Sequence, residues 1–168
     1  MDRYILSVLV NNHSGVLSRI AGLFSRRGYN IDSLSVGETE DHEISRMTIA
    51  VKGDAAVLEQ ITKQLEKQID VIHVQVLNPQ DSVFRELMMV KINTPQDKRA
   101  VVVELADIFK AKIVDVDTET LTVELTGETD KLEAFFRLIE PYGIRELVRT
   151  GLIAVGRGNE TINDARLS

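Results

Sequence analysis

The sequence predicts an α+β protein in which one order of elements, βαββαβ, occurs twice along 168 residues. Two observations support this class. Short apolar or alternating runs, typical of strands, are interleaved with segments whose apolar residues recur at helical spacing. A polar cluster containing Pro79 separates the two series near the middle of the chain. Two units of this order and size indicate two ferredoxin-like domains, each an antiparallel sheet with both helices on one face.

The first series starts with a nearly continuous apolar run at residues 4–10, which predicts a strand. Further strands are expected at 31–36, after a helix, and at 45–51, beyond a polar hairpin turn. Asp54 is a suitable N-cap for a second helix, and alternation at 72–76 predicts a fourth strand. The first helix would bury one face, formed by Val16, Ile20, Leu23 and Phe24.

The second series begins with a strand at 84–92 and a helix that starts near Pro95. Strands follow at 113–116 and 121–125, and the last strand lies within 144–155. The two helices have apolar faces, formed by Val101, Leu105, Ile108 and Phe109 in one and by Leu132, Phe135, Phe136 and Ile139 in the other.

These patterns divide the chain into a first domain at 1–78, a linker at 79–83, a second domain at 84–157 and a flexible tail at 158–168. Helices on one face of each sheet leave the other face bare, and domains this small bury only about 60% of the surface that their unfolded chains expose. We therefore expect dimerisation to cover the bare face, so the protein should be a homo-oligomer.

Composition excludes several classes of function. The net charge of −6 disfavours a nucleic-acid surface, which needs clustered Lys and Arg. The absence of Cys excludes a disulfide framework and a thiolate nucleophile. No run approaches the ~20 apolar residues of a membrane span, and the N-terminus lacks the features of a signal peptide. We expect a soluble, cytoplasmic protein.

The chain shows no pattern of catalytic or metal-ligating residues. His13, His42 and His73 lack the paired spacing of metal ligands. No Gly-rich phosphate loop is present, and no arrangement of Ser with His or of paired carboxylates could be defended as catalytic. We therefore expect no catalytic site, metal site or cofactor in this chain.

The junction between the first strand and the first helix is the best candidate for a binding site. Asn12 offers an amide donor and acceptor, and Gly15 lets a ligand approach the backbone at a helix N-terminus, where unpaired N–H groups attract anions. This chemistry suits the carboxylate and ammonium of an amino acid. Capping is the alternative, with Ser14 as N-cap and with Gly28 and Asn30 as an ordinary helix end. Periodicity does not decide between the two.

Several segments resemble one known family. They are "LSVLVNNHSGVLSRIAGLFSRRGYNIDSLSVG", "ISRMTIAVKGD" and "LEQITKQLEKQIDV" in the first half, and "RELMMVKI", "IFKAKIVDV" and "RTGLIAVGRG" in the second. Together they resemble the regulatory (small) subunits of acetolactate synthase, also called acetohydroxyacid synthase, over nearly the whole chain. The first domain is similar to the ACT domain of that family.

The resemblance implies a regulatory subunit without a catalytic site of its own. The large subunit of the family holds thiamine diphosphate, Mg²⁺ and FAD. The small subunit activates it and confers feedback inhibition by branched-chain amino acids, chiefly valine. The resemblance also implies that the effector binds where two ACT domains meet in a homodimer. The C-terminal domain is assigned to subunit contacts.

The family's effector positions correspond to residues of the junction. On one protomer they are Asn12, Ser14, Gly15, Val16 and Leu17. On the partner subunit they are Asn30 and Ile31. Many ACT domains carry Pro just before the loop glycine, whereas this sequence has Ser14 there.

Two other functions are compatible with an ACT-like domain. One is a stand-alone enzyme on a ferredoxin-like scaffold, which the lack of a catalytic constellation disfavours. The other is an amino-acid-sensing regulator of another enzyme or of transcription. A transcriptional regulator would need a DNA-binding module, and neither a helix-turn-helix pattern nor a basic face is visible in the sequence.

Overall fold

The computed structural model describes residues 2–164 and divides the chain into two compact units. The first unit comprises the chain up to Phe84 together with the residues from Leu152 onward, and the second comprises Arg85–Gly151. The sequence division placed everything from 84 to 157 in the second domain. It differs because the chain returns to the first unit at Leu152.

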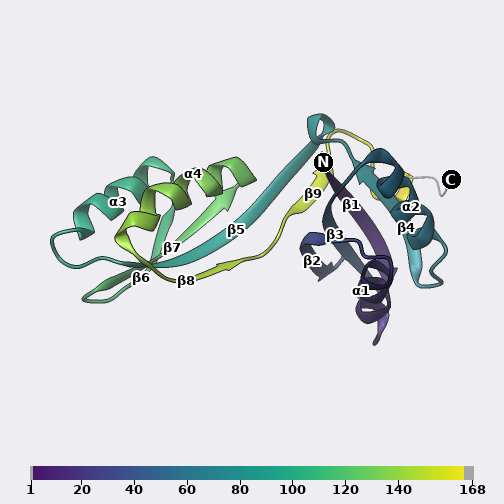
Figure 1. Cartoon of the computed structure of the whole chain (residues 1–168), viewed down its shortest axis with the longest axis horizontal. Coiled ribbons are helices and arrows are strands. Elements are labelled where there is room, and N and C mark those ends of the chain that lie inside the picture. Colours follow the sequence, from purple (N-terminus) through teal and green to yellow (C-terminus); the bar gives the residue numbers. More distant parts are fainter. Residues whose placement is uncertain (1, 165–168) are drawn as a thin grey trace. The chain divides into compact units, whose positions relative to one another are not determined.

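The first unit contains one antiparallel sheet with the strand order β2-β3-β1-β4, which confirms the predicted α+β class (Figure 1). Its elements in chain order are β1 (Asp2–Asn11), α1 (Val16–Arg26), β2 (Ile31–Glu38), β3 (Ile44–Gly53), α2 (Ala55–Glu66) and β4 (Val71–Leu77). The predicted N-cap of α2 is confirmed, because the Asp54 side chain accepts a hydrogen bond from the Val57 N–H.

The core of the first unit lies between the sheet and the two helices. Alternate residues of β1 point into it, and they meet Ile61 and Leu65 of α2. The predicted face of α1 is buried as a whole, since all four of its residues are at most 3% exposed. The large apolar side chains that share this core include Leu6, Val8, Ile20, Leu23, Phe24, Met47 and Ile49.

The opposite face of the first sheet is covered by the chain's own returning segment. Strand β9 (Ile153–Gly156) pairs with β5, and a second apolar cluster forms from Ile5, Ala50, Leu77, Leu152 and Ala154. Arg46 adds a hydrogen bond from Nη2 to the Ala154 carbonyl, 2.9 Å long. The expectation that dimerisation must cover this face therefore loses its physical basis, and a homodimer has to be argued from other features.

The tail expected to be loose is in part packed. A short 3-10 helix, η3 (Ile162–Asp164), follows β9, and Ile162 is only 6% exposed. The Asp164 carboxylate accepts hydrogen bonds from the Thr161 N–H at 2.9 Å and hydroxyl at 3.0 Å. Residues 165–168 of the predicted tail lie outside the described part of the chain.

The second unit contains the sheet order β6-β7-β5-β8, again antiparallel. Its elements are β5 (Ser82–Asn93), which begins in the first unit, α3 (Arg99–Ile108), β6 (Lys112–Val116), β7 (Thr120–Gly127), α4 (Thr129–Ile139) and β8 (Ile144–Arg149), with a short 3-10 turn η2 (Glu140–Tyr142) after α4. Another 3-10 turn, η1 (Pro79–Asp81), precedes β5 in the first unit. Met88 is buried in the core, whereas Met89 is 40% exposed on the opposite side of β5.

The predicted face of α3 is wrong in two positions. Val101 and Ile108 are 41% and 66% exposed, whereas Val102 and Ala106 are buried against the sheet. The face chosen from the sequence followed the largest apolar side chains. The helix instead turns a smaller residue, Ala106, to the sheet, which lets the two approach closely. Among residues 2–164, no helix combines the length and the apolar character required to cross a membrane.

Candidate functional site

The N-terminus of α1 is formed by Gly15 in a left-handed conformation. Its φ of 89° and ψ of −12° are strained for any residue with a Cβ, and no side chain caps the helix. Ser14 is therefore not the N-cap that the capping alternative required. The backbone N–H groups of Leu17 and Ser18 have no backbone acceptor among the described residues. They are the unpaired donors expected of a first helical turn.

The loop before Gly15 is anchored by Asp70, which precedes β4 and is 7% exposed. Its carboxylate accepts a hydrogen bond from Arg19 Nε at 3.0 Å and a second from Nη2 of the same guanidinium. His13 Nε2 lies 3.3 Å from the other oxygen, and the Asn11 N–H donates to the Asp70 carbonyl at 2.9 Å. One buried residue thus holds both the strand end and the first turn of the helix.

Arg19 also places positive charge beside Gly15. A Cβ placed on Gly15 would lie 3.1 Å from Arg19 Nη1, the guanidinium nitrogen that has no hydrogen bond to Asp70. This nitrogen and the unpaired N–H groups of Leu17 and Ser18 are all hydrogen-bond donors. They therefore favour the binding of a carboxylate at the N-terminus of α1.

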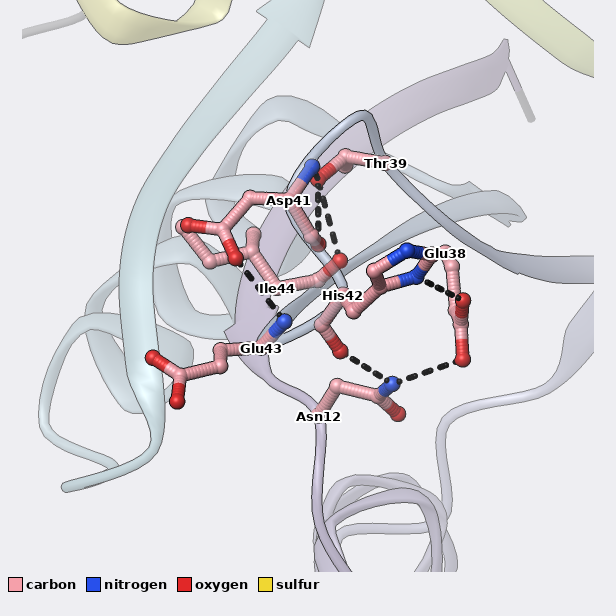
Figure 2. Close-up of polar contacts among 7 residues, drawn as sticks. All are labelled: Asn12, Glu38, Thr39, Asp41, His42, Glu43 and Ile44. Atoms are coloured by element: carbon pink, nitrogen blue, oxygen red, sulfur yellow. Dashed lines mark hydrogen bonds and ion pairs between the residues drawn. The ribbon is translucent and has the colours of Figure 1, made fainter.

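Asn12 ties the loop to the hairpin between β2 and β3 (Figure 2). Its Nδ2 donates to Glu38 Oε1 at 3.2 Å and to the His42 carbonyl at 2.8 Å. Its backbone N–H donates to the Glu43 carbonyl at 2.7 Å. The side-chain donor of Asn12 is therefore engaged inside the chain, and Oδ1 is the atom left to accept a hydrogen bond from a ligand.

The far end of α1 shows which predicted residues capping explains. Gly28, at φ 70°, follows the helix, the Gly28 N–H donates to Ser25, and the Tyr29 N–H donates to the Phe24 carbonyl. This is a Schellman motif, and its apolar contact is the edge-to-face pair of Phe24 and Tyr29, with ring centroids 6.4 Å apart. Capping therefore accounts for Gly28. It leaves Asn30 unexplained, since that exposed side chain has no hydrogen bond within residues 2–164.

The structure gathers the predicted site residues into two groups rather than one. Asn12, Ser14, Gly15 and Leu17 are exposed around the N-terminus of α1, where Leu17 has 48% of its surface free and Val16 is buried. Asn30 is exposed and Ile31 half-buried beyond the C-terminus of the helix. Eleven helical residues separate the groups, which corresponds to about 16 Å. One small ligand cannot contact both groups of the same chain.

Comparison with known proteins gives a consistent result over the whole length. The family model described as "AHAS small subunit-like ACT domain" matches residues 6–73, and "Small subunit of acetolactate synthase" matches 85–158. A probable acetolactate synthase small subunit from Methanothermobacter thermautotrophicus is 51% identical over 96% of this chain and 96% of its own length. The acetolactate synthase small subunit of Mycolicibacterium smegmatis is 49% identical over 97% and 96%. The chain belongs to the acetolactate synthase small-subunit family.

A solved structure supports the same assignment. The acetolactate synthase small subunit from Thermotoga maritima superimposes with a TM-score of 0.88 at 40% identity, covering 95% of this chain and 100% of that one. This acetolactate synthase small subunit therefore carries an ACT domain and has a regulatory role within the synthase holoenzyme, in association with the catalytic subunit. Within residues 2–164 of the small subunit, no three His, Asp or Glu side chains gather as a metal site would require.

Sequence reasoning missed the residues that position the loop of this small subunit. Arg19 could have been found, because it lies one helical turn after Gly15 on the same side of α1. Asp70 and Glu38 could not, because they reach the loop from elements 51 and 26 positions away from their partners. The candidate binding residues could be chosen from the sequence by residue type, whereas the residues that orient them depend on the fold.

Proposed function

We propose that this chain activates the thiamine-diphosphate-dependent large subunit of acetolactate synthase and confers feedback inhibition by valine, or by leucine or isoleucine. The effector would bind between two ACT domains of a homodimer in the cytoplasm. The observation that carries this proposal is the N-terminus of α1. There, Gly15 leaves the N–H groups of Leu17 and Ser18 without acceptors beside Arg19 Nη1.

In this proposal, each part of the amino acid contacts a different group of the loop. The carboxylate would accept hydrogen bonds from the two N–H groups and from Arg19 Nη1, since all three are donors. The ammonium would donate to Asn12 Oδ1, the atom of that side chain without a partner in the chain. The exposed side chain of Leu17 offers an apolar surface to the isopropyl group.

A second copy of the chain completes the site. Asn30 and Ile31 lie too far from Gly15 in one chain to contact the same ligand, so their share in binding requires the partner subunit. Asn30 of the partner subunit would close over the amino acid, and Ile31 of the partner subunit would contact its side chain. Effector binding would then stabilise one dimer arrangement, and such coupling is typically worth about 1–3 kcal/mol.

The test is titration calorimetry with valine, leucine, isoleucine and aspartate, combined with assays of the reconstituted synthase. We expect saturable valine binding near one site per protomer and partial inhibition of the holoenzyme. Gly15→Asp should abolish both, because its carboxylate competes for the same N–H groups and repels the effector. Activation of the large subunit should remain.

Gly15→Ala is the matched control. It imposes the same backbone strain, of about 1–2 kcal/mol, without adding a charge. We expect weakened but measurable valine inhibition in this variant. Full valine inhibition in a folded Gly15→Asp variant would contradict the site, and failure of the chain to raise synthase activity would contradict the regulatory role.

A further inference from the structure

The first unit contains a cavity that the effector site does not use. It has a volume of about 600 Å³, within the range of small-molecule pockets, and all of its lining residues belong to the first unit. It lies between the β2–β3 hairpin and the returning segment 155–163, over the sheet face that faces away from α1 and α2. Its side chains combine a single cation, several carboxylates and aliphatic groups.

The cation is Arg46 of β3, which is half-buried. Its guanidinium donates one hydrogen bond, to the Ala154 carbonyl, and no carboxylate lies within ion-pair distance among residues 2–164. Because the side chain is half-buried, its charge is incompletely solvated, and this burial lowers the pKa of Arg46 below its ordinary value. A guanidinium remains charged at neutral pH, so its free donors favour an anionic group in the cavity.

The carboxylates differ in how far they are already engaged. Glu38 holds Asn12 and His42, and Asp41 accepts from the Glu43 N–H at 2.9 Å. Glu40 and Glu160 also line the cavity, and neither has a hydrogen bond or ion pair within the described part of the chain. These two are available to a positively charged group.

The rest of the lining is part aliphatic and part polar, and its uncharged polar side chains are Thr39, Gln75, Thr161 and Asn163. Leu9 and Ile162 form the buried aliphatic part, and Ile44 and Val155 are more accessible. One cation, two carboxylates without a partner among residues 2–164 and a partly aliphatic lining match a molecule that carries both charges and an apolar substituent. A purely anionic ligand would meet the carboxylates, and a purely cationic one would leave Arg46 unpaired in a partly desolvated place.

We propose that this cavity is a second binding site, for a small zwitterion of the aliphatic amino-acid class, whose carboxylate pairs with Arg46 and whose ammonium pairs with Glu40 or Glu160. The site lies within one chain and needs no partner subunit. It goes beyond the proposed effector site and does not depend on it.

The cavity and the effector loop share the β2–β3 hairpin. Glu38 lines the cavity, and its carboxylate also accepts a hydrogen bond from Asn12 (Figure 2). A ligand that moves this hairpin therefore also acts on Asn12, and the coupling between two sites is reciprocal. Occupancy of the cavity should therefore change the valine affinity of the loop.

The test uses the full chain with isoleucine δ1-methyl labelling and NMR titration with valine, leucine and isoleucine. Ile44 and Ile162 report on the cavity, Ile31 reports on the proposed effector site, and Ile139 in the second unit is the control. We expect saturable shifts of the Ile44 and Ile162 methyls with at least one amino acid, also in a Gly15→Asp background. If the proposed effector site is wrong but the cavity binds, only the Ile31 response will be missing.

Charge variants distinguish binding through the charged groups of the cavity from a general effect of changing the protein's charge. Arg46→Gln should weaken the cavity response about tenfold or more, because a charge-assisted hydrogen bond is lost. Lys52→Gln, on the same face of β3 but outside the cavity, should not. Since Arg46→Gln also removes the bond to Ala154, the double variant Glu40→Gln with Glu160→Gln provides a second measurement that leaves that bond intact.

Two analogues of valine test the need for both charges. Isobutylamine lacks the carboxylate and isovalerate lacks the ammonium, so both should bind at least about tenfold more weakly than valine. Three results would each overturn the proposal. The first is that the Ile44 and Ile162 methyls do not shift up to the solubility limit of any of the three amino acids. The second is unchanged amino-acid binding in both charge variants, and the third is an analogue that binds as tightly as valine.

Discussion

At the scale of single residues, Asp70 connects the start of β4 with the loop before α1. It is nearly buried, and it joins β4 to the loop through Arg19 and His13. Loss of its carboxylate would leave the Arg19 guanidinium free to rotate away from Gly15. The proposed effector loop would then keep its backbone N–H donors but lose the Arg19 cation beside Gly15.

Asp70→Ala should therefore reduce both stability and valine affinity. We expect a loss of about 1.5–3 kcal/mol in the free energy of unfolding, because hydrogen bonds to a charged group are removed. Urea denaturation measures this loss, and calorimetry measures the affinity. Asp54→Ala is the control, since removal of the α2 N-cap costs about 1 kcal/mol without touching the loop. Equal valine affinity in the two variants would contradict a role for Asp70 in binding.

The residue types of the candidate site could be read from the sequence, but their hydrogen-bond partners could not. Asn12 and Gly15 were chosen for their chemistry, and the structure places both at the exposed end of α1. That the Asn12 amide is held by Glu38, so that only its oxygen is available, depends on a contact across 26 positions. Local patterns cannot supply such contacts, because they arise from the packing of distant elements.

At the scale of elements, periodicity was reliable where one helical face is uniformly large and apolar. The face of α1 was correct, since Ile20, Leu23 and Phe24 fill one stripe. It failed for α3, where Ala106 faces the sheet and Ile108 faces solvent. Apolar residues on several sides of a helix leave the buried side to be decided by the sheet against which the helix packs.

The role of the returning segment, which begins at Leu152, could not be predicted from the sequence. Leu152 and Ala154 are 4% and 8% exposed, whereas Ile153 between them is 54% exposed. This alternation shows that one side of the segment packs onto the first sheet. Nothing in the run itself reveals that it packs onto residues more than a hundred positions earlier, Ile5 and Ala50.

Leu152→Ala should destabilise the first unit strongly, because truncation of a buried leucine leaves a cavity. The expected loss is about 2–5 kcal/mol in the free energy of unfolding, measured by urea denaturation. Ile153→Ala removes a similar amount of side chain from the next, exposed position and should change stability by less than about 0.5 kcal/mol. Similar losses in the two variants would show that the segment does not pack as described.

At the scale of the whole molecule, the second unit is an insertion in the first. The chain leaves the first unit after Phe84 and returns at Leu152, and both residues belong to the same apolar cluster. The two points of departure and return are therefore close together. Such an arrangement allows an inserted domain to be removed or exchanged without cutting the core of its host.

Excision of residues 85–151, with a short Gly-Ser linker in their place, should leave a first unit that folds cooperatively and binds valine. A chain that stops at Phe84 has the same strands and helices but lacks the returning segment. We expect it to aggregate or to unfold at much lower urea concentration, because Ile5, Ala50 and Leu77 lose their cover. Circular dichroism and sedimentation of both chains test this, and equal stability would contradict the role of the segment.

The returning segment also sets an order of events during synthesis on the ribosome. The strands that carry Ile5, Ala50 and Leu77 are translated well before Leu152 and Ala154, the residues that cover them. At about 5–20 residues per second, the interval between positions 84 and 164 lasts roughly 4–16 s. The nascent first sheet presents an apolar face throughout that interval, while the inserted unit is made. Messenger RNAs truncated within the region that encodes the second unit should therefore yield protein fragments that chaperones retain and proteases degrade.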